Sequence, residues 1–130
     1  MNKDLIQELI ERALTRKVPF PEVLTALSKE GVESYHVDLL RDEFRYYAKN
    51  GDSLIIALPL PHKGVAGEFS AERIEDINRR VQAGQASYAD FIAESTTAGC
   101  AYYIVFLNGK MVRYFGRHGG EHVQYFPGSR

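Results

Sequence analysis

Near its start, the chain repeats apolar residues every three or four positions, which is the spacing of one face of an α-helix. This pattern predicts a helix over 5–14 and a second over 20–27, and Gly31 provides a stop for the second helix. Apolar and polar residues then alternate, as they do along a strand with one buried face. The strands expected from this alternation and from the turn sequence KNGD cover 35–39, 44–48 and 53–58.

The same order of patterns restarts in the second half. Ser70 is a suitable N-cap for a third helix, and apolar residues continue that helix to Val81. Ser87 and Asp90 have the spacing of a capping box at the start of a fourth helix. Gly99 is expected to end this helix, as Gly31 ends the second.

A hairpin is predicted to follow the fourth helix. Two strands meet at Asn108-Gly109, the preferred dipeptide of a two-residue hairpin turn. Such a turn pairs Val105 with Val112 and Tyr103 with Tyr114, and we expect these four side chains to face the helices. A last short strand is predicted near the end of the chain.

The second half repeats the first at a constant offset. With a shift of 68 positions, as from Asn2 to Ser70, the halves align without a gap up to Pro59 and Pro127. The identical pairs are Ile6/Ile74, Arg12/Arg80, Gly31/Gly99, Tyr35/Tyr103, Val37/Val105, Leu39/Leu107, Arg45/Arg113, Tyr46/Tyr114, Gly51/Gly119 and Pro59/Pro127. They fall at predicted helix stops, strand cores and turns, which indicates an internal duplication.

The expected fold class is therefore α+β, with two ααβββ repeats related by a pseudo-two-fold axis and helices packed on antiparallel sheet. We expect one domain over 1–130, because a single repeat is too small to bury a proper core. Repeat one is predicted at 2–59, a linker at 60–69 and repeat two at 70–127. The pattern leaves open whether the two three-stranded units join into one sheet or face each other.

The two repeats differ on the sheet face that points away from the helices. In repeat two, this face is apolar apart from one arginine: Tyr102, Ile104, Phe106, Met111, Arg113 and Phe115. In repeat one it is polar: Ser34, His36, Asp38, Glu43, Arg45 and Tyr47. Strands that are apolar on both faces are usually covered on both. The cover of repeat two could be a homodimer mate, a foreign partner, a ligand, or the linker or tail of the chain itself.

Composition and charge narrow the class of protein. With 45% apolar and 25% charged residues, the chain is typical of globular proteins. The formal charge of −1 gives no overall field that favours nucleic acid or membrane. No apolar run approaches the ~20 residues of a membrane helix, and the acidic, amphipathic start is unlike a signal peptide. We therefore expect a cytoplasmic protein that does not associate with membranes.

The polar face of repeat one carries the candidate binding residues. His36 and Asp38 lie two positions apart on one strand face, with Glu43 and Arg45 nearby, and His62 of the linker could reach a site between the repeats. A carboxylate beside an imidazole can orient a general base. The same residues are also typical of a solvated strand face, so no catalytic residue is predicted.

Other chemistry-bearing residues give weaker signals. The segment HGGEH, from His118 to His122, has the spacing of an inverted zinc-protease motif, but its adjacent glycines disfavour the helix that this motif needs. Cys100 is the single cysteine and aligns with Val32, which predicts an unreactive buried thiol. We predict no metal and no cofactor.

Basic and aromatic residues mix around the last hairpin. Lys110, Arg113 and Arg117 lie among tyrosines and Phe115, a mixture that can stack single-stranded nucleic acid. Only Arg113 shares a strand face with Phe115. Nucleic-acid binding is therefore not expected.

The second half also carries a family resemblance. The residues concerned are Gln82, Tyr88, Phe91, Ala98, Gly99, Cys100, Tyr103, Gly109, Tyr114, Phe115, Gly116, His122 and Pro127. In these residues, and in the segment GVESYHVDL at 31–39, the chain resembles a family of bacterial and prophage proteins of similar length. That family is often labelled "phage envelope protein" and is otherwise described as a domain of unknown function. The resemblance implies no catalytic residues.

Two functional hypotheses follow. The first is a non-enzymatic binding or interaction module that forms a homodimer through the apolar face of repeat two. The alternative is a small enzyme or small-molecule binder with a polar site around His36 and Asp38, at or near the interface of the repeats.

Overall fold

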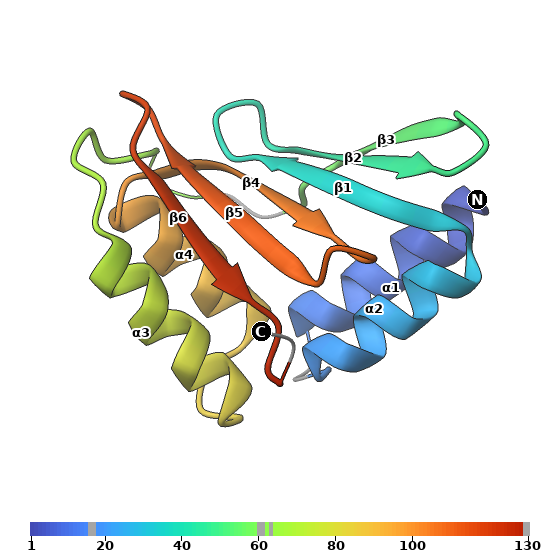
Figure 1. Ribbon diagram of the computed structural model, residues 1–130, viewed down its shortest axis with the longest axis horizontal. Helices are drawn as coiled ribbons and strands as arrows, with labels where there is room; N and C mark the ends of the chain where they lie inside the picture. Colours follow the sequence, from blue (N-terminus) through green and yellow to red (C-terminus); the bar gives the residue numbers. More distant parts are fainter. Residues whose placement is uncertain (16–17, 60–61, 63, 129–130) are drawn as a thin grey trace.

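The computed structural model describes residues 1–15, 18–59, 62 and 64–128, and the order of elements is helix-helix-three strands, twice (Figure 1). The helices are α1 (Lys3–Thr15), α2 (Phe20–Lys29), α3 (Ala71–Gln82) and α4 (Tyr88–Thr97). The strands are β1 (Val32–Asp38), β2 (Glu43–Ala48), β3 (Ser53–Ala57), β4 (Cys100–Phe106), β5 (Met111–Gly116) and β6 (Glu121–Tyr125). The predicted α+β class and the repeated order of elements are confirmed.

All six strands form one antiparallel sheet in the order β3-β2-β1-β4-β5-β6. The two halves therefore join edge to edge through β1 and β4, which answers the question that the sequence left open. The helix pairs α1/α2 and α3/α4 lie side by side under the same face of the sheet (Figure 1). The result is a layer of helices and a layer of sheet, and none of the described helices lies on the second face of the sheet.

Hydrogen bonds repeat at the offset of 68 that the sequence alignment uses. Leu39 donates its backbone N–H to Ala101, and the equivalent Leu107 donates to Glu33, so the two bonds are exchanged across the β1–β4 boundary. The loops after β1 and β4 behave alike, with positive φ at Asp42 (55°) and at its equivalent, Lys110 (53°). The repeat is thus visible in backbone geometry, while the repeat and linker boundaries stay a prediction.

The turn between β4 and β5 differs from the prediction. A two-residue turn of the type expected at Asn-Gly needs positive φ at its central residues, yet the positive φ lies at Lys110 and not at Asn108 or Gly109. Strand β4 ends at Phe106, and the four residues 107–110 form the turn. The loop therefore has the conformation of its counterpart in repeat one, where no Asn-Gly occurs, and the fold rather than the dipeptide sets it.

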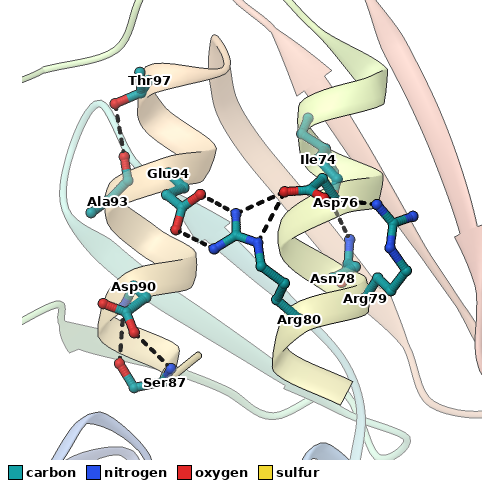
Figure 2. A network of polar contacts seen from close by, with 10 residues as sticks. All are labelled: Ile74, Asp76, Asn78, Arg79, Arg80, Ser87, Asp90, Ala93, Glu94 and Thr97. Carbon is teal, nitrogen blue, oxygen red and sulfur yellow. Dashed lines mark hydrogen bonds and ion pairs between the residues drawn. The ribbon is translucent and has the colours of Figure 1, made fainter. Parts of the chain in front are cut away.

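Local signals position the helices of repeat two. Ser87 and Asp90 form the predicted capping box, and Ser70 caps α3 by accepting from the backbone of Arg73. Arg80 of α3 bonds the carboxylates of both Asp76 and Glu94, so it ties α3 to α4 (Figure 2). These contacts fix the α3/α4 pair as one unit against the sheet.

The apolar core lies between the helices and the sheet and draws on both repeats. Its fully buried members include Ile6 and Leu27 from the first helix pair and Ile74 and Ile92 from the second. Within the described parts of the chain, no helix is long and apolar enough to cross a membrane.

Candidate functional site: the open face of the sheet

The open face is the side of the sheet that carries no helix, and it brings together the residues that the sequence singled out on both repeats. Strand pairing sets its side chains in three rows that cross the sheet from β3 to β6. The rows are Ser53, Tyr47, Ser34, Phe106, Met111 and Tyr125; then Ile55, Arg45, His36, Ile104, Arg113 and Val123; then Ala57, Glu43, Asp38, Tyr102, Phe115 and Glu121. The polar residues predicted on repeat one and the apolar residues predicted on repeat two thus form adjacent halves of one surface, called the polar half and the apolar half.

The charged side chains of the polar half form ion pairs with one another. Arg45 lies 3.4 Å from Asp38 Oδ2 and 3.3 Å from Glu43 Oε2. Arg45 Nε has no partner of good hydrogen-bond geometry, but its distance to Glu43 still makes an ion pair. Asp38 is 6% exposed and also accepts from the backbone N–H groups of Leu40 and Arg41. Its carboxylate therefore shapes the β1–β2 turn and holds Arg45.

His36 occupies the middle row beside Arg45. Its ring lies 5.0 Å from the ring of Tyr47, centroid to centroid. Burial, together with the smaller effect of the Arg45 guanidinium, lowers the pKa of His36 from its usual value. A neutral imidazole next to a cation is typical of a packed surface residue. Asp38, the carboxylate that could orient the imidazole, is already paired with Arg45.

His62 lies with the β1–β2 turn. Its Nε2 is 2.6 Å from Asp42 Oδ1, and its Nδ1 accepts from the backbone N–H of Gly64 at 3.0 Å. Since Nδ1 is an acceptor, Nε2 carries the proton and donates it to Asp42. Within the described residues His62 makes no hydrogen bond to His36 or Asp38. No hydrogen bond therefore supports the prediction that His62 forms one binding site with these two residues.

The side chains of the apolar half are partly accessible to solvent. Tyr102 is 37% exposed, and Ile104, Phe106, Met111 and Phe115 are half-buried by their neighbours. Arg113 forms an ion pair with Glu121 at 2.6 Å, so its charge is compensated within the face.

The two edge strands add one exposed apolar residue at each end of the open face, beside the polar half on β3 and beside the apolar half on β6. Ile55 on β3 is 57% exposed and Tyr125 on β6 is 41% exposed, and both point to the open face. The alternation of residues along 53–57 and 121–125 places each of these side chains on one face of its strand. Which face of the sheet this is can be assigned only once both strands are known to belong to the same sheet.

The remaining sequence candidates have structural roles. HGGEH forms a turn and the start of β6, as its glycines predicted, and His122 stacks on Tyr114 with 6.1 Å between ring centroids. In the described part of the chain, no three His, Cys, Asp or Glu side chains gather as a metal site would require. Cys100 is fully buried, and burial raises the pKa of its thiol to about 12, which leaves it unreactive as a nucleophile.

Comparison with known proteins places the chain in a family. The family model described as "Protein of unknown function (DUF1398)" matches residues 7–123, which covers both repeats. The chain belongs to this family. A search of curated proteins gives no significant match. The resemblance seen in the sequence is thus confirmed as membership of a family of unknown function, and the family description does not carry the phage envelope label.

Proposed function

We propose that this member of DUF1398 is a non-enzymatic interaction module that forms a homodimer through the open face of the sheet. The observation that carries the proposal is the apolar half of that face, where Tyr102, Ile104, Phe106, Met111 and Phe115 adjoin one another with no helix above them. A contiguous apolar patch on a regular sheet surface is typical of a protein–protein contact.

A second copy of the chain suits this face better than a charged partner. The two arginines of the face, Arg45 and Arg113, are each paired with carboxylates of the same face. The face therefore offers little uncompensated charge for a partner of opposite sign, and two copies would not repel each other. Two-fold dimers are also the commonest oligomers, and they need a patch that tolerates contact with itself.

The arrangement of the face suggests how two copies would meet. Stacking the β4–β5 halves would cover Ile104 and Phe106 and leave the polar half at the rim, where ion pairs stay hydrated. Sheets that pack face to face lie about 10 Å apart, with interdigitated apolar side chains.

The test is the oligomeric state of matched variants. Light scattering coupled to gel filtration, over a dilution series, should find the wild type dimeric and both Phe106→Lys and Ile104→Glu monomeric. Leu5→Lys is the control, because Leu5 is 51% exposed on α1, away from the open face, and its substitution should leave the dimer intact. A wild type that is monomeric throughout the series would rule the proposal out.

The alternative, a small-molecule or catalytic site around His36 and Asp38, has less support. The carboxylates of Asp38 and Glu43 are occupied by Arg45, which leaves no free acid to orient His36. Nucleic-acid binding is weaker still, because Arg113 is paired with Glu121 and Arg117 donates to the backbone oxygen of Val65. Cytoplasmic location and a phage or prophage origin remain predictions.

A further inference from the structure

The layer between the helices and the sheet contains a cavity of about 330 Å³, on the opposite side of the sheet from the open face. Residues of both helix pairs and of the sheet strands that face them line the cavity. Its apolar walls include Ile10, Val23, Phe44, Phe91 and Val105. Its volume lies at the lower end of the range for small-molecule sites. None of the described residues that line it carries a charge.

Four tyrosines on the inner face of the sheet line this cavity in two equivalent pairs. Tyr35 faces Tyr46 across β1 and β2, with ring centroids 5.2 Å apart. Tyr103 and Tyr114, their counterparts in repeat two, face each other across β4 and β5 at 5.6 Å. The duplication has thus placed four phenol groups around the centre of the molecule.

The hydroxyls of the two pairs differ in their partners. Tyr103 shares a hydrogen bond with the hydroxyl of Tyr88, and Tyr114 bonds the side-chain amide of Asn78. Repeat one has Phe20 in place of Tyr88 and Ile10 in place of Asn78, and neither can bond a phenol. The sequence difference between the repeats therefore removes both partners.

As a result, Tyr35 and Tyr46 have no hydrogen bond from their hydroxyls to any described residue, although only 5% and 2% of these residues is exposed. A buried hydroxyl without a partner is unfavourable, because it has given up its hydrogen bonds to water. Among the described residues, the fully buried side-chain atoms without a hydrogen-bond partner are Arg45 Nε, Ser95 Oγ and His122 Nε2. Neither tyrosine oxygen is among them, so neither is completely covered by protein atoms. The two hydroxyls therefore face the empty space of the cavity.

We propose that the cavity binds a neutral, mainly apolar small molecule with a carbonyl-type acceptor, which receives hydrogen bonds from Tyr35 and Tyr46. Burial raises the pKa of both phenols well above the usual value, so both remain protonated donors. A carboxylate or ammonium ligand is disfavoured, because a charge would lose its hydration without meeting an opposite charge.

The rim of the cavity is formed by α2, the turn between α3 and α4, and the segment after β6. Its exposed lining residues include Pro19 and Pro21 at the start of α2, Gly84 after α3, and Pro127 after β6. Phe20 and Phe126 meet edge to face at this rim, 5.5 Å between centroids. We expect a small ligand to enter from this side, away from the open face.

Binding can be tested with three probes of similar shape: benzophenone, which has a neutral carbonyl; diphenylmethane, which lacks the carbonyl; and diphenylacetate, which is charged. Titration calorimetry should find that benzophenone saturates the wild type. Diphenylmethane should bind at least about fivefold more weakly, because it accepts neither of the two hydrogen bonds. Diphenylacetate should bind at least about tenfold more weakly than benzophenone. No saturable binding of benzophenone, or equal binding of diphenylacetate, would overturn the proposal.

Matched variants locate the site. Tyr35→Phe and Tyr46→Phe should reduce the preference for benzophenone over diphenylmethane, while Tyr103→Phe, whose hydroxyl already has a protein partner, should retain it. Val23→Trp should fill the cavity and abolish binding of both probes. Irradiation of bound benzophenone locates it without any substitution, since adducts should form on cavity-lining segments. Adducts elsewhere, or an unchanged preference in both Tyr35→Phe and Tyr46→Phe, would contradict the assignment.

This inference is independent of the dimer. Phe106→Lys lies on the open face and should bind benzophenone as the wild type does, whether or not it is monomeric. Loss of the dimer with retained binding would thus leave the cavity proposal standing, and a dimer without binding would refute the cavity proposal alone.

Discussion

His36 and Ile104 occupy equivalent positions in the two repeats and face each other across the β1–β4 boundary. The pairs on either side, Ser34 with Phe106 and Asp38 with Tyr102, are exchanged by the same equivalence, so the pseudo-two-fold axis passes between His36 and Ile104. At the one place where a symmetric molecule would pair identical residues, this chain pairs an imidazole with a branched aliphatic side chain. The polar and apolar halves of the open face meet at this point.

Replacing His36 by the residue at its equivalent position should reduce the sensitivity of folding to acid. The pKa of His36 is lowered in the folded state, mainly by burial and further by Arg45, so the unfolded state binds the proton more readily. The free energy of unfolding of the wild type should therefore fall as pH drops through the unfolded value of about 6.5. His36→Ile should show a smaller fall over this interval, measured by urea unfolding at pH values on both sides of it.

Asp38 and Arg113 share the open face with His36, and Arg45 is its direct neighbour; all three are present in both the wild type and His36→Ile. A difference between the two pH profiles therefore reports on the imidazole. An identical pH dependence in wild type and His36→Ile would contradict the expected role of the imidazole.

The equivalent tyrosines Tyr46 and Tyr114 should respond differently to loss of the hydroxyl. Each is 2% exposed, but only Tyr114 has a partner, the amide of Asn78. Tyr114→Phe should cost about 1–2 kcal/mol in the free energy of unfolding, because a hydrogen bond is lost and the partly buried amide of Asn78 loses a partner. Tyr46→Phe should leave it unchanged or raise it, because the substitution removes a buried hydroxyl that has no hydrogen-bond partner among the described residues. Denaturant unfolding of the two variants makes the comparison, and equal losses would argue against it.

Much of the fold follows from the sequence because its patterns are local. Alternation predicted the strand faces, so Val105 and Tyr103 point to the helices as expected even though the turn at Asn108-Gly109 has another conformation. The register survives because burial of one strand face fixes it more strongly than the turn does.

Contacts between the repeats are harder to predict. Pairing of β1 with β4 joins strands far apart in the chain, and alternation is the same for a strand at an edge and one in the centre. The cavity depends on the space left between two helix pairs, which no local pattern encodes. One signal was nevertheless available, since aligning the repeats places Phe20 opposite Tyr88 and Ile10 opposite Asn78.

Arg80 should stabilise the protein at neutral pH through its bridge between α3 and α4 (Figure 2). The hydrogen bond from Arg80 lowers the pKa of Asp76, so this part of the stability is present above the unfolded pKa of about 3.9. It is lost as pH falls through the lower, folded value. In thermal unfolding, Arg80→Met should therefore be less stable than wild type near pH 7. The difference between the two proteins should shrink in acid and in high salt.

Arg12 provides the control for this measurement. It is the equivalent of Arg80 in repeat one, it is exposed, and it forms no ion pair with any described residue. Arg12→Met should leave thermal stability near the wild-type value both near pH 7 and in acid. If the two variants lost equal stability, the bridge in repeat two would not be the cause.

Gly31 and Gly99 should differ sharply in their tolerance of alanine, although both end a helix with positive φ, at 84° and 86°. A Cβ on Gly31 would have no atom within 4 Å, so Gly31→Ala should cost only the backbone strain of about 1–2 kcal/mol. A Cβ on Gly99 would lie 2.1 Å from the backbone oxygen of Glu68. Gly99→Ala should therefore cost about 3 kcal/mol or more, because overpacking adds to the same strain.

The extra cost at Gly99 has a local signature, because the linker must move away from the end of α4. The backbone N–H of Ser70 bonds Ala98 at 2.8 Å, and that of Ala66 bonds Thr96 at 3.0 Å, and both bonds hold the linker in place. Hydrogen exchange at these two amides should accelerate in Gly99→Ala by more than its loss of global stability explains, and should follow global stability in Gly31→Ala. If both variants showed the same exchange pattern and the same free energy of unfolding, the close approach of the linker to Gly99 would have no energetic weight.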